Sequence, residues 1–206
     1  AKIPCLIHNT SSNASGNTDS NPIGEGSAIM QYICNVSNNT NNSSISSIYP
    51  PPMCLESSQQ RAKIDFWLSW YHHNTRNCTL KLFHPYIFRK MYENIGGYEK
   101  VFNPGLKSIN KSFQYIENHF KNNNIMYLTG NNVTIADYML LPEIDKLFSS
   151  GYGILPNFQH DYPYIYQWWN NCNTNISSYK SNYDVVAIAG QAYQERIAVK
   201  MEKTEK

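Results

Sequence analysis

MYLTGNNVTIADYMLLPEIDK, residues 126–146, is the stretch around which the rest of the chain is organised. Residues 130–132 form a turn, and Thr134 stands three residues before Asp137. This is the spacing of a capping box, in which the Thr hydroxyl accepts an N–H of the first helical turn and the acid accepts the N–H of the Thr. A mostly apolar run follows, so we expect a buried central helix after Thr134. Such a box nucleates a helix and performs no chemistry.

Length, charge and cysteine content narrow the class of protein. The 206 residues can form one large domain or two small ones, and the formal net charge of +2 contains no basic block typical of nucleic-acid binding. No apolar run approaches the roughly 20 residues needed to cross a bilayer. The five cysteines are scattered without CxxC or Cys/His clustering, which favours reduced thiols in a cytoplasmic compartment over disulfides or a metal site. We therefore expect no nucleic-acid, membrane or metal partner.

The first quarter of the chain alternates between structured and polar segments. Residues 2–8 are apolar and β-branched and predict a strand, with Pro4 at an edge position or after a cis peptide bond. Residues 9–22 are rich in Asn, Ser and Gly and predict a mobile loop. A short helix with one apolar face is expected to follow, and Glu25 and Ser27 are suitable residues for its start.

A second Asn/Ser-rich tract, residues 35–53, contains three consecutive prolines near its end. Such a tract is typical of a linker or an exposed loop. We place the domain boundary here, with residues 1–53 as a first domain that carries two polar insertions and residues 54–206 as an all-helical second domain.

Apolar side chains recur at helical spacing in the second domain and predict its core. We expect Pro85 to kink the first part, Pro104 to start the next helix, residues 122–124 to end that helix, and a last helix to cover residues 185–201. The two clearest stripes are Ile64, Trp67, Leu68 and Tyr71, and Leu106, Ile109, Phe113, Ile116 and Phe120.

Three segments resemble the glutathione transferase family. Residues 127–144 are similar to the YLTG…TIAD segment that opens the central helix of its C-terminal domain, and Trp70-x-His72 with Arg76 resembles the theta class. The strand and the Glu25-x-x-Ala-Ile helix at the start of the chain are similar to the second half of the family's thioredoxin-like domain. The resemblance implies an α+β fold, in which a partial thioredoxin-like α/β domain precedes an all-α glutathione-transferase C-terminal helical domain.

The resemblance also implies a function, namely conjugation of the glutathione thiolate to hydrophobic electrophiles by a homodimer, with detoxification as its role. In the family, the residue before the proline pairs through its backbone with the cysteinyl part of glutathione. The Glu and the residue after it hold the γ-glutamyl end at a helix N-terminus, and the Arg adds positive charge. Gly26 departs from the usual Ser or Thr. The implied glutathione-binding residues are Lys2, Ile3, Pro4, Glu25, Gly26, Ser27 and Arg76.

The resemblance assigns no catalytic residue to this chain. The theta class activates the thiol with a Ser near its N-terminus, and no residue here matches that Ser. The chain opens at Ala1 without a Met. We therefore expect a chain truncated before its first strand, helix and second strand, which is inactive as given.

Other interpretations remain open. The alternative to the transferase is a non-catalytic transferase-fold module, of the kind that mediates protein contacts in translation-elongation and tRNA-synthetase assemblies. Gly26 and the two polar insertions favour this alternative, whereas the Trp70-x-His72 and Arg76 segment favours an enzyme. A third interpretation is a degenerate member that binds small apolar ligands. From the residues alone, Trp70 is a core residue, His72 and His73 are solvated, and Arg76 pairs with a local carboxylate.

Overall fold

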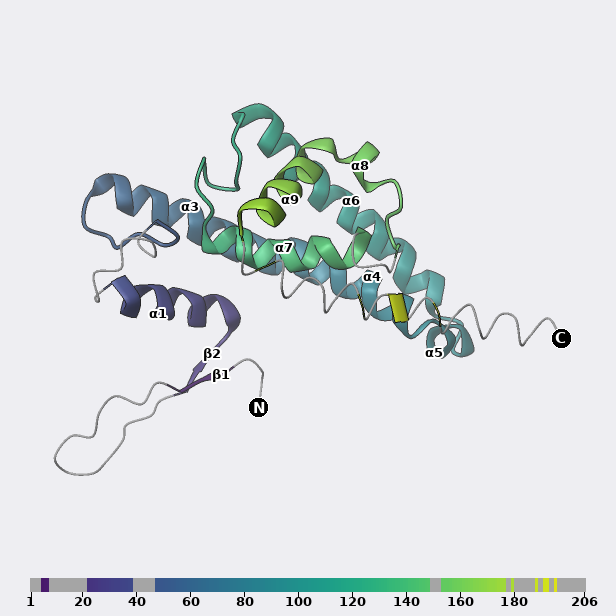
Figure 1. Cartoon of the computed structure of the whole chain (residues 1–206). Coiled ribbons are helices and arrows are strands. Elements are labelled where there is room, and N and C mark those ends of the chain that lie inside the picture. The colour runs from purple at the N-terminus through teal and green to yellow at the C-terminus, as the bar shows by residue number, and fades with distance from the viewer. Residues whose placement is uncertain are drawn as a thin grey trace, which may run out of the picture.

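The computed structural model describes residues 5–7, 22–38, 47–148 and 153–176, together with Tyr179, Ile188, Gln191, Ala192 and Glu195. The first part is a short hairpin followed by a helix (Figure 1). Strand β1 (Cys5–Leu6) pairs antiparallel with β2 (Ile23–Gly24), so that Cys5 lies opposite Gly24. Helix α1 (Gly26–Asn38) begins after a single intervening residue, Glu25. Of the strand predicted over residues 2–8, the structure shows only Cys5–Leu6 as a strand, and β2 is not predicted by the sequence pattern.

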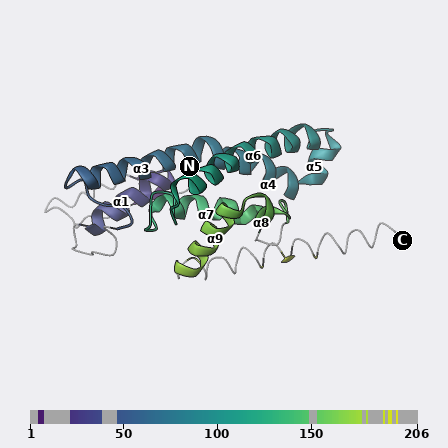
Figure 2. The ribbon, with the colours of Figure 1, turned by 90° about the horizontal axis from the view of Figure 1, so that it is seen from above.

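The remainder is helical. One rod comprises α3 (Leu55–Tyr71), the π-helical turn η1 (His72–Arg76) and α4 (Asn77–Ile87), and it lies along α6, as Figure 2 shows from above. The other helices are α5 (Arg89–Asn94), α6 (Tyr98–Asn123), α7 (Ile135–Phe148), α8 (Phe158–Asp161) and α9 (Pro163–Asn175).

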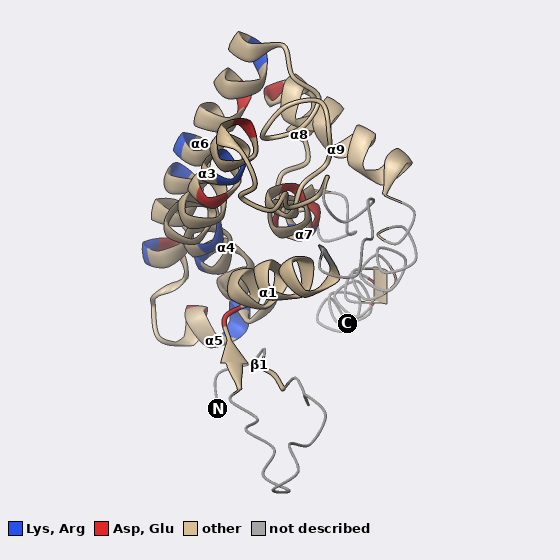
Figure 3. Cartoon of the chain, turned by 90° about the vertical axis from the view of Figure 1, so that its left-hand side faces the viewer, with Lys and Arg blue, Asp and Glu red and all other residues tan. Residues whose placement is uncertain are grey.

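Helix α7 is the central element, as predicted from its sequence. Figure 3 shows α7 end-on, with neighbours on three sides. Helix α1 lies on one side, the rod together with α6 lies on the second, and α8 with α9 lies on the third. Both predicted stripes pack into the core around it: Ile64, Trp67, Leu68 and Tyr71 are buried on α3, and on α6 only Leu106 of its stripe is partly exposed. The periodicity predicts these stripes because each helix presents one apolar face to its neighbours.

Several predicted boundaries are corrected by the structure. Helix α1 continues to Asn38, beyond the predicted start of the second polar tract. Helix α6 begins at Tyr98, and Pro104 lies inside it on the exposed side, where only one main-chain bond is lost. Pro85 lies within α4, and the helix ends instead at Phe88, which has φ −101° and ψ 32°. The end of α6 is confirmed, because Asn124 adopts the left-handed conformation with φ 49°.

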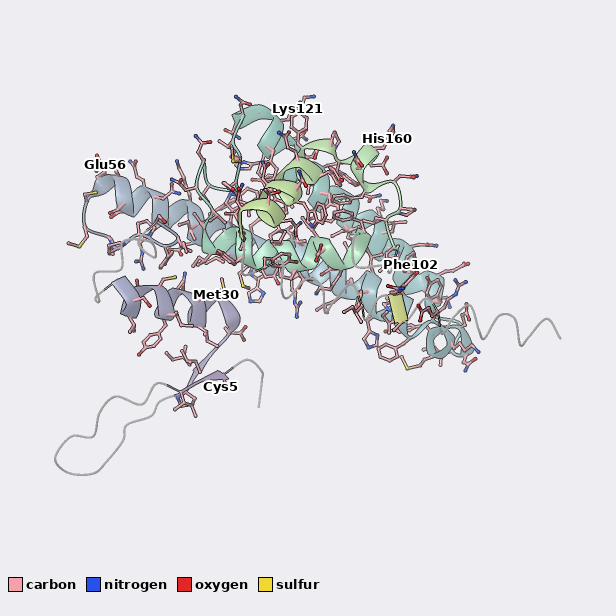
Figure 4. The ribbon with its side chains drawn as sticks, in the orientation of Figure 1. Cys5, Met30, Glu56, Phe102, Lys121 and His160 are labelled. Carbon is pink, nitrogen blue, oxygen red and sulfur yellow. The ribbon has the colours of Figure 1, made fainter. Side chains whose placement is uncertain are left out.

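The segment before α3 is fixed to the helical body. The carbonyl of Ile48 accepts the N–H of Ile135 at 3.3 Å, and the buried Tyr49 donates to Asp65 at 2.9 Å. Met30 of α1 is partly buried and packs against the same core (Figure 4). The boundary after residue 53 stays a prediction. The mobile loop is predicted over residues 9–22, and all of it except residue 22 lies outside the described residues, as does most of the helix predicted over residues 185–201.

Candidate functional site

The start of α1 combines an unusual backbone with a helix N-terminus. Glu25 has φ 69°, the left-handed region that non-glycine residues rarely adopt. Such strain concentrates at functional sites because the surrounding structure must hold it in place. The carbonyl of Glu25 accepts the N–H of Ile29 at 3.0 Å, so the first helical turn begins at Gly26 and Ser27. The N–H groups and the dipole of such a turn attract a carboxylate.

His72 of η1 lies against this turn. Its Nε2 is 3.6 Å from Oε2 of Glu25, and the two side chains are 43% and 64% exposed. The imidazole also stacks on Tyr71, with ring centroids 5.6 Å apart. His72 and His73 are both exposed, as the residues alone predict, but His72 also contacts Glu25 and so joins the helical rod to the start of α1.

Arg76 lies one helical turn beyond His72, and its side chain reaches Glu143 of α7. Its guanidinium donates to Oε1 of Glu143 and is still 39% exposed. Burial lowers the pKa of Arg76, but the charge and hydrogen bond of Glu143 outweigh this and raise it. Of the two interpretations of Arg76, pairing with a carboxylate is present in the structure. Contact of its exposed part with glutathione stays a prediction.

Glu143 collects donors from the rod and from its own helix, although its side chain is only 3% exposed. Tyr71 donates to Oε1 at 3.2 Å, the hydroxyl of Thr79 donates to Oε2, and the ammonium of Lys146 lies 2.9 Å from Oε2. No local sequence pattern predicts this cluster, because Arg76 and Glu143 are 67 residues apart. The one available signal was an acid inside the apolar run of α7.

Asp137 forms a second buried cluster on α7. Its Oδ2 accepts the N–H of Thr134 at 2.8 Å and the Thr134 hydroxyl at 3.0 Å. Its Oδ1 accepts the N–H of Leu128 and the indole N–H of Trp168, both at 2.9 Å. The predicted return of the acid to Thr134 is confirmed. The predicted role of the hydroxyl is wrong, because it donates to Asp137, whose own N–H bonds the Thr134 carbonyl at 3.0 Å.

The remaining predicted site residues divide into two groups. Gly26 and Ser27 are partly buried in the first turn of α1, beside Glu25. Lys2, Ile3 and Pro4 lie outside the described residues, so the structure does not place them. Within the described part of the chain, no three His, Cys, Asp or Glu side chains gather as a metal site would require. In that same part no helix combines the length and apolarity needed to cross a bilayer.

Comparison with known families identifies the helical body. Residues 80–175 match the family model described as glutathione S-transferase, C-terminal domain. These residues cover α4 to α9 and include Glu143 and Asp137. This part of the chain is therefore similar to that domain, in agreement with the resemblance seen in the sequence. No curated protein sequence matches the chain at a significant level.

Solved structures show the same fold over most of the chain. A delta-class glutathione transferase of Nilaparvata lugens has a TM-score of 0.63 at 16% identity, covering 87% of this chain and 73% of its own. A rice transferase solved in complex with glutathione has a TM-score of 0.59 at 17% identity, covering 93% and 77%. The GST-like domain of elongation factor 1-gamma from Saccharomyces cerevisiae has a TM-score of 0.60 at 18% identity, covering 76% and 65%. These likenesses show a mostly helical glutathione transferase fold with a small N-terminal β element.

Proposed function

We propose that the protein is a theta-like glutathione transferase that conjugates glutathione to hydrophobic electrophiles. The observation that carries this proposal is the start of α1, where Glu25 has a left-handed backbone and lies against His72. The Trp70-x-His72 and Arg76 pattern supports the theta-like class. The solved relatives support the fold but not the class, since the similar transferase of Nilaparvata lugens is of the delta class.

The chemistry of the site suits one end of glutathione. The γ-glutamyl end carries an ammonium and a carboxylate, which match the exposed carboxylate of Glu25 and the N–H groups of Gly26 and Ser27. Lys2, Ile3, Pro4 and Arg76 complete the proposed binding set. In the reaction the thiolate sulfur forms a bond to the electrophilic carbon, and the leaving group departs with the electron pair of the broken bond. We assign no catalytic residue and no metal, and glutathione is the co-substrate.

We also propose a homodimer in the cytoplasm. Large side chains lie exposed on neighbouring faces of α3 and α6, where Phe66 is 49% and Tyr115 is 48% exposed. Exposed aromatic side chains of this kind are typical of a face that another protein covers. The five cysteines are all free thiols, which suits a reducing compartment.

Glutathione binding tests the proposal directly. The full-length protein is expected to be retained on immobilised glutathione and to conjugate a reactive halide or epoxide. Arg76→Ala is expected to weaken glutathione binding while the protein stays folded, measured by titration calorimetry beside a melting curve. Unchanged affinity in this variant would remove Arg76 from the site.

A second candidate is a non-catalytic module that mediates protein contacts. Two observations favour it: the fold similarity to the GST-like domain of elongation factor 1-gamma, and Gly26 at the position where the family usually has a hydroxyl. Failure of the folded protein to bind glutathione at millimolar concentration would favour this candidate over the transferase.

A further inference from the structure

The π-helical turn η1 is held in place from two sides. Thr75, which is fully buried, shares a 2.9 Å hydrogen bond with Ser112 of α6. Arg76, the next residue, pairs with Glu143 of α7. A π-helical turn shifts the main-chain pairing by one residue, and such turns are frequent at functional sites. The side-chain amide of Asn74 donates to the main-chain carbonyl of Trp70 at 2.9 Å and thereby supports this altered pairing.

The carboxylate of Glu143 accepts hydrogen bonds from residues at both ends of this turn. Tyr71 immediately precedes η1, Arg76 is its last residue, and Thr79 follows in the first turn of α4. All three donate to Glu143. Because the donors approach from before and after η1, the carboxylate fixes the turn as a whole rather than one side chain.

We propose that Glu143 is a positioning residue, which holds η1 in the π-helical register that places His72 against Glu25 and thereby sets the affinity for glutathione. The second half of this statement rests on the function proposed above. An α-helical register would rotate a side chain by about 100° for each residue of shift. His72 is the first residue of η1 and its Nε2 lies 3.6 Å from Oε2 of Glu25, so a rotation of this size would carry the imidazole away from the carboxylate.

Asp145 provides a matched control on the same helix. It is buried to 1% exposure, like Glu143, and stands two residues later. Its carboxylate accepts the indole N–H of Trp169 and the hydroxyl of Tyr179, both at 2.8 Å. These bonds join α7 to Trp169 of α9 and to Tyr179 after it. A variant at Asp145 therefore loses a buried carboxylate without removing a donor bond from η1.

The test compares Glu143→Gln with Asp145→Asn in the full-length protein. Calorimetric titration gives the dissociation constant for glutathione, and hydrogen exchange gives the opening of the amides of residues 72–76. Glu143→Gln is expected to raise the dissociation constant about tenfold, within the range of couplings between connected sites. It is also expected to speed exchange at residues 72–76. Asp145→Asn is expected to change the dissociation constant less than about twofold and to leave that exchange unaltered.

The two proposals fail in different ways. If both variants shift affinity and exchange at residues 72–76 equally, Glu143 only stabilises the core and its positioning role is overturned. If the wild-type protein does not bind glutathione, the proposed function fails. The exchange measurement then still decides the positioning of η1: selective acceleration in Glu143→Gln supports it, and equal rates in the two variants overturn it.

Discussion

Two buried carboxylates on α7, Asp137 and Glu143, have surroundings of opposite kind. Asp137 accepts four hydrogen bonds, all from uncharged donors. Glu143 lies against two cations, Arg76 and Lys146, and also accepts hydroxyl groups. Both satisfy the requirement that a buried charge be compensated. On this one helix, the carboxylate of Asp137 stabilises the helix start, and the carboxylate of Glu143 bonds to residues of η1 and α4.

The pKa values of the two groups shift in opposite directions. Burial raises the pKa of Asp137, and the hydrogen bonds from Leu128, Trp168 and Thr134 oppose this only in part. Burial also raises the pKa of Glu143, but there the nearby charges reverse the direction. The buried carboxylate of Asp137 is therefore stabilised by uncharged hydrogen-bond donors, whereas that of Glu143 is stabilised mainly by the charges of neighbouring cations.

For Glu143, the charge of Lys146, the hydrogen bond of Thr79 and the charge of Arg76 together outweigh burial and lower the pKa. A group whose folded pKa lies below its unfolded value stabilises the fold above the unfolded pKa. This contribution is lost as pH falls through the folded pKa. The comparison between the two carboxylates can therefore be tested with pH as well as with substitutions.

The largest effect is expected for Asp137→Ala, which leaves three buried N–H donors without their acceptor. Each unsatisfied buried group costs about 1–3 kcal/mol, so the loss of unfolding free energy should be about 4 kcal/mol. Urea denaturation measures it. Asp161→Ala removes an exposed carboxylate on α8 and should stay within about 0.5 kcal/mol of the wild type. Equal effects of the two substitutions would contradict the role assigned to Asp137.

Glu143→Gln is expected to destabilise the protein by about 2 kcal/mol at neutral pH. This is less than the 3–5 kcal/mol typical of breaking a fully buried pair, because Arg76 is partly exposed and solvent screens it. The difference in unfolding free energy between wild type and variant should stay constant down to about pH 4.3, the unfolded pKa of Glu, and narrow below it. Urea denaturation across this pH range measures it. A difference that grows on acidification would mean that the cations do not control Glu143.

A smaller effect is expected for Thr134→Ala, which keeps the main-chain bond to Asp137 and removes a buried hydroxyl that donates to Asp137 and accepts from Thr129. The loss of a buried hydrogen bond costs about 1 kcal/mol, or roughly 2–4 °C in melting temperature for a chain of this size. Thr174→Ala, which removes an exposed hydroxyl from α9, is the control. An unchanged melting temperature in Thr134→Ala would show that this hydroxyl does not stabilise the Asp137 cluster.

Local patterns made much of the fold predictable. The stripe from Ile64 to Tyr71 and the spacing of Thr134 and Asp137 depend on residues within two turns of one another, so the sequence displays them directly. The match of residues 80–175 to the family model agrees with the resemblance found there. The local pattern does not predict the direction of the Thr134 hydroxyl, which accepts from the Thr129 hydroxyl at 3.4 Å and donates to Asp137 at 3.0 Å.

The candidate site was predicted only in outline. Glu25 was found because it precedes a helical pattern, whereas its contact with His72 crosses 47 residues of chain and leaves no local trace. The residues of the π-helical turn are equally compatible with an α-helix, so no local pattern distinguishes the two. The resemblance predicts that Arg76 contacts glutathione and the residues alone predict a carboxylate partner, but that partner, Glu143, lies on another helix 67 residues away and is not evident in the sequence.

The smallest effect is expected for Tyr71→Phe, which removes one uncharged donor from Glu143. Burial and the charge of Glu143 raise the pKa of Tyr71, so its hydroxyl keeps its proton throughout the neutral range. The bond is 3.2 Å long and Glu143 retains three other partners, so the loss should be about 0.5 kcal/mol, the low end for a hydrogen bond. Tyr164→Phe, which alters an exposed ring on α9, gives the baseline in the same urea titration. A cost for Tyr71→Phe as large as that of Glu143→Gln would mean that hydroxyl donors, and not the two cations, hold the carboxylate, and Glu143 would then be of the same kind as Asp137.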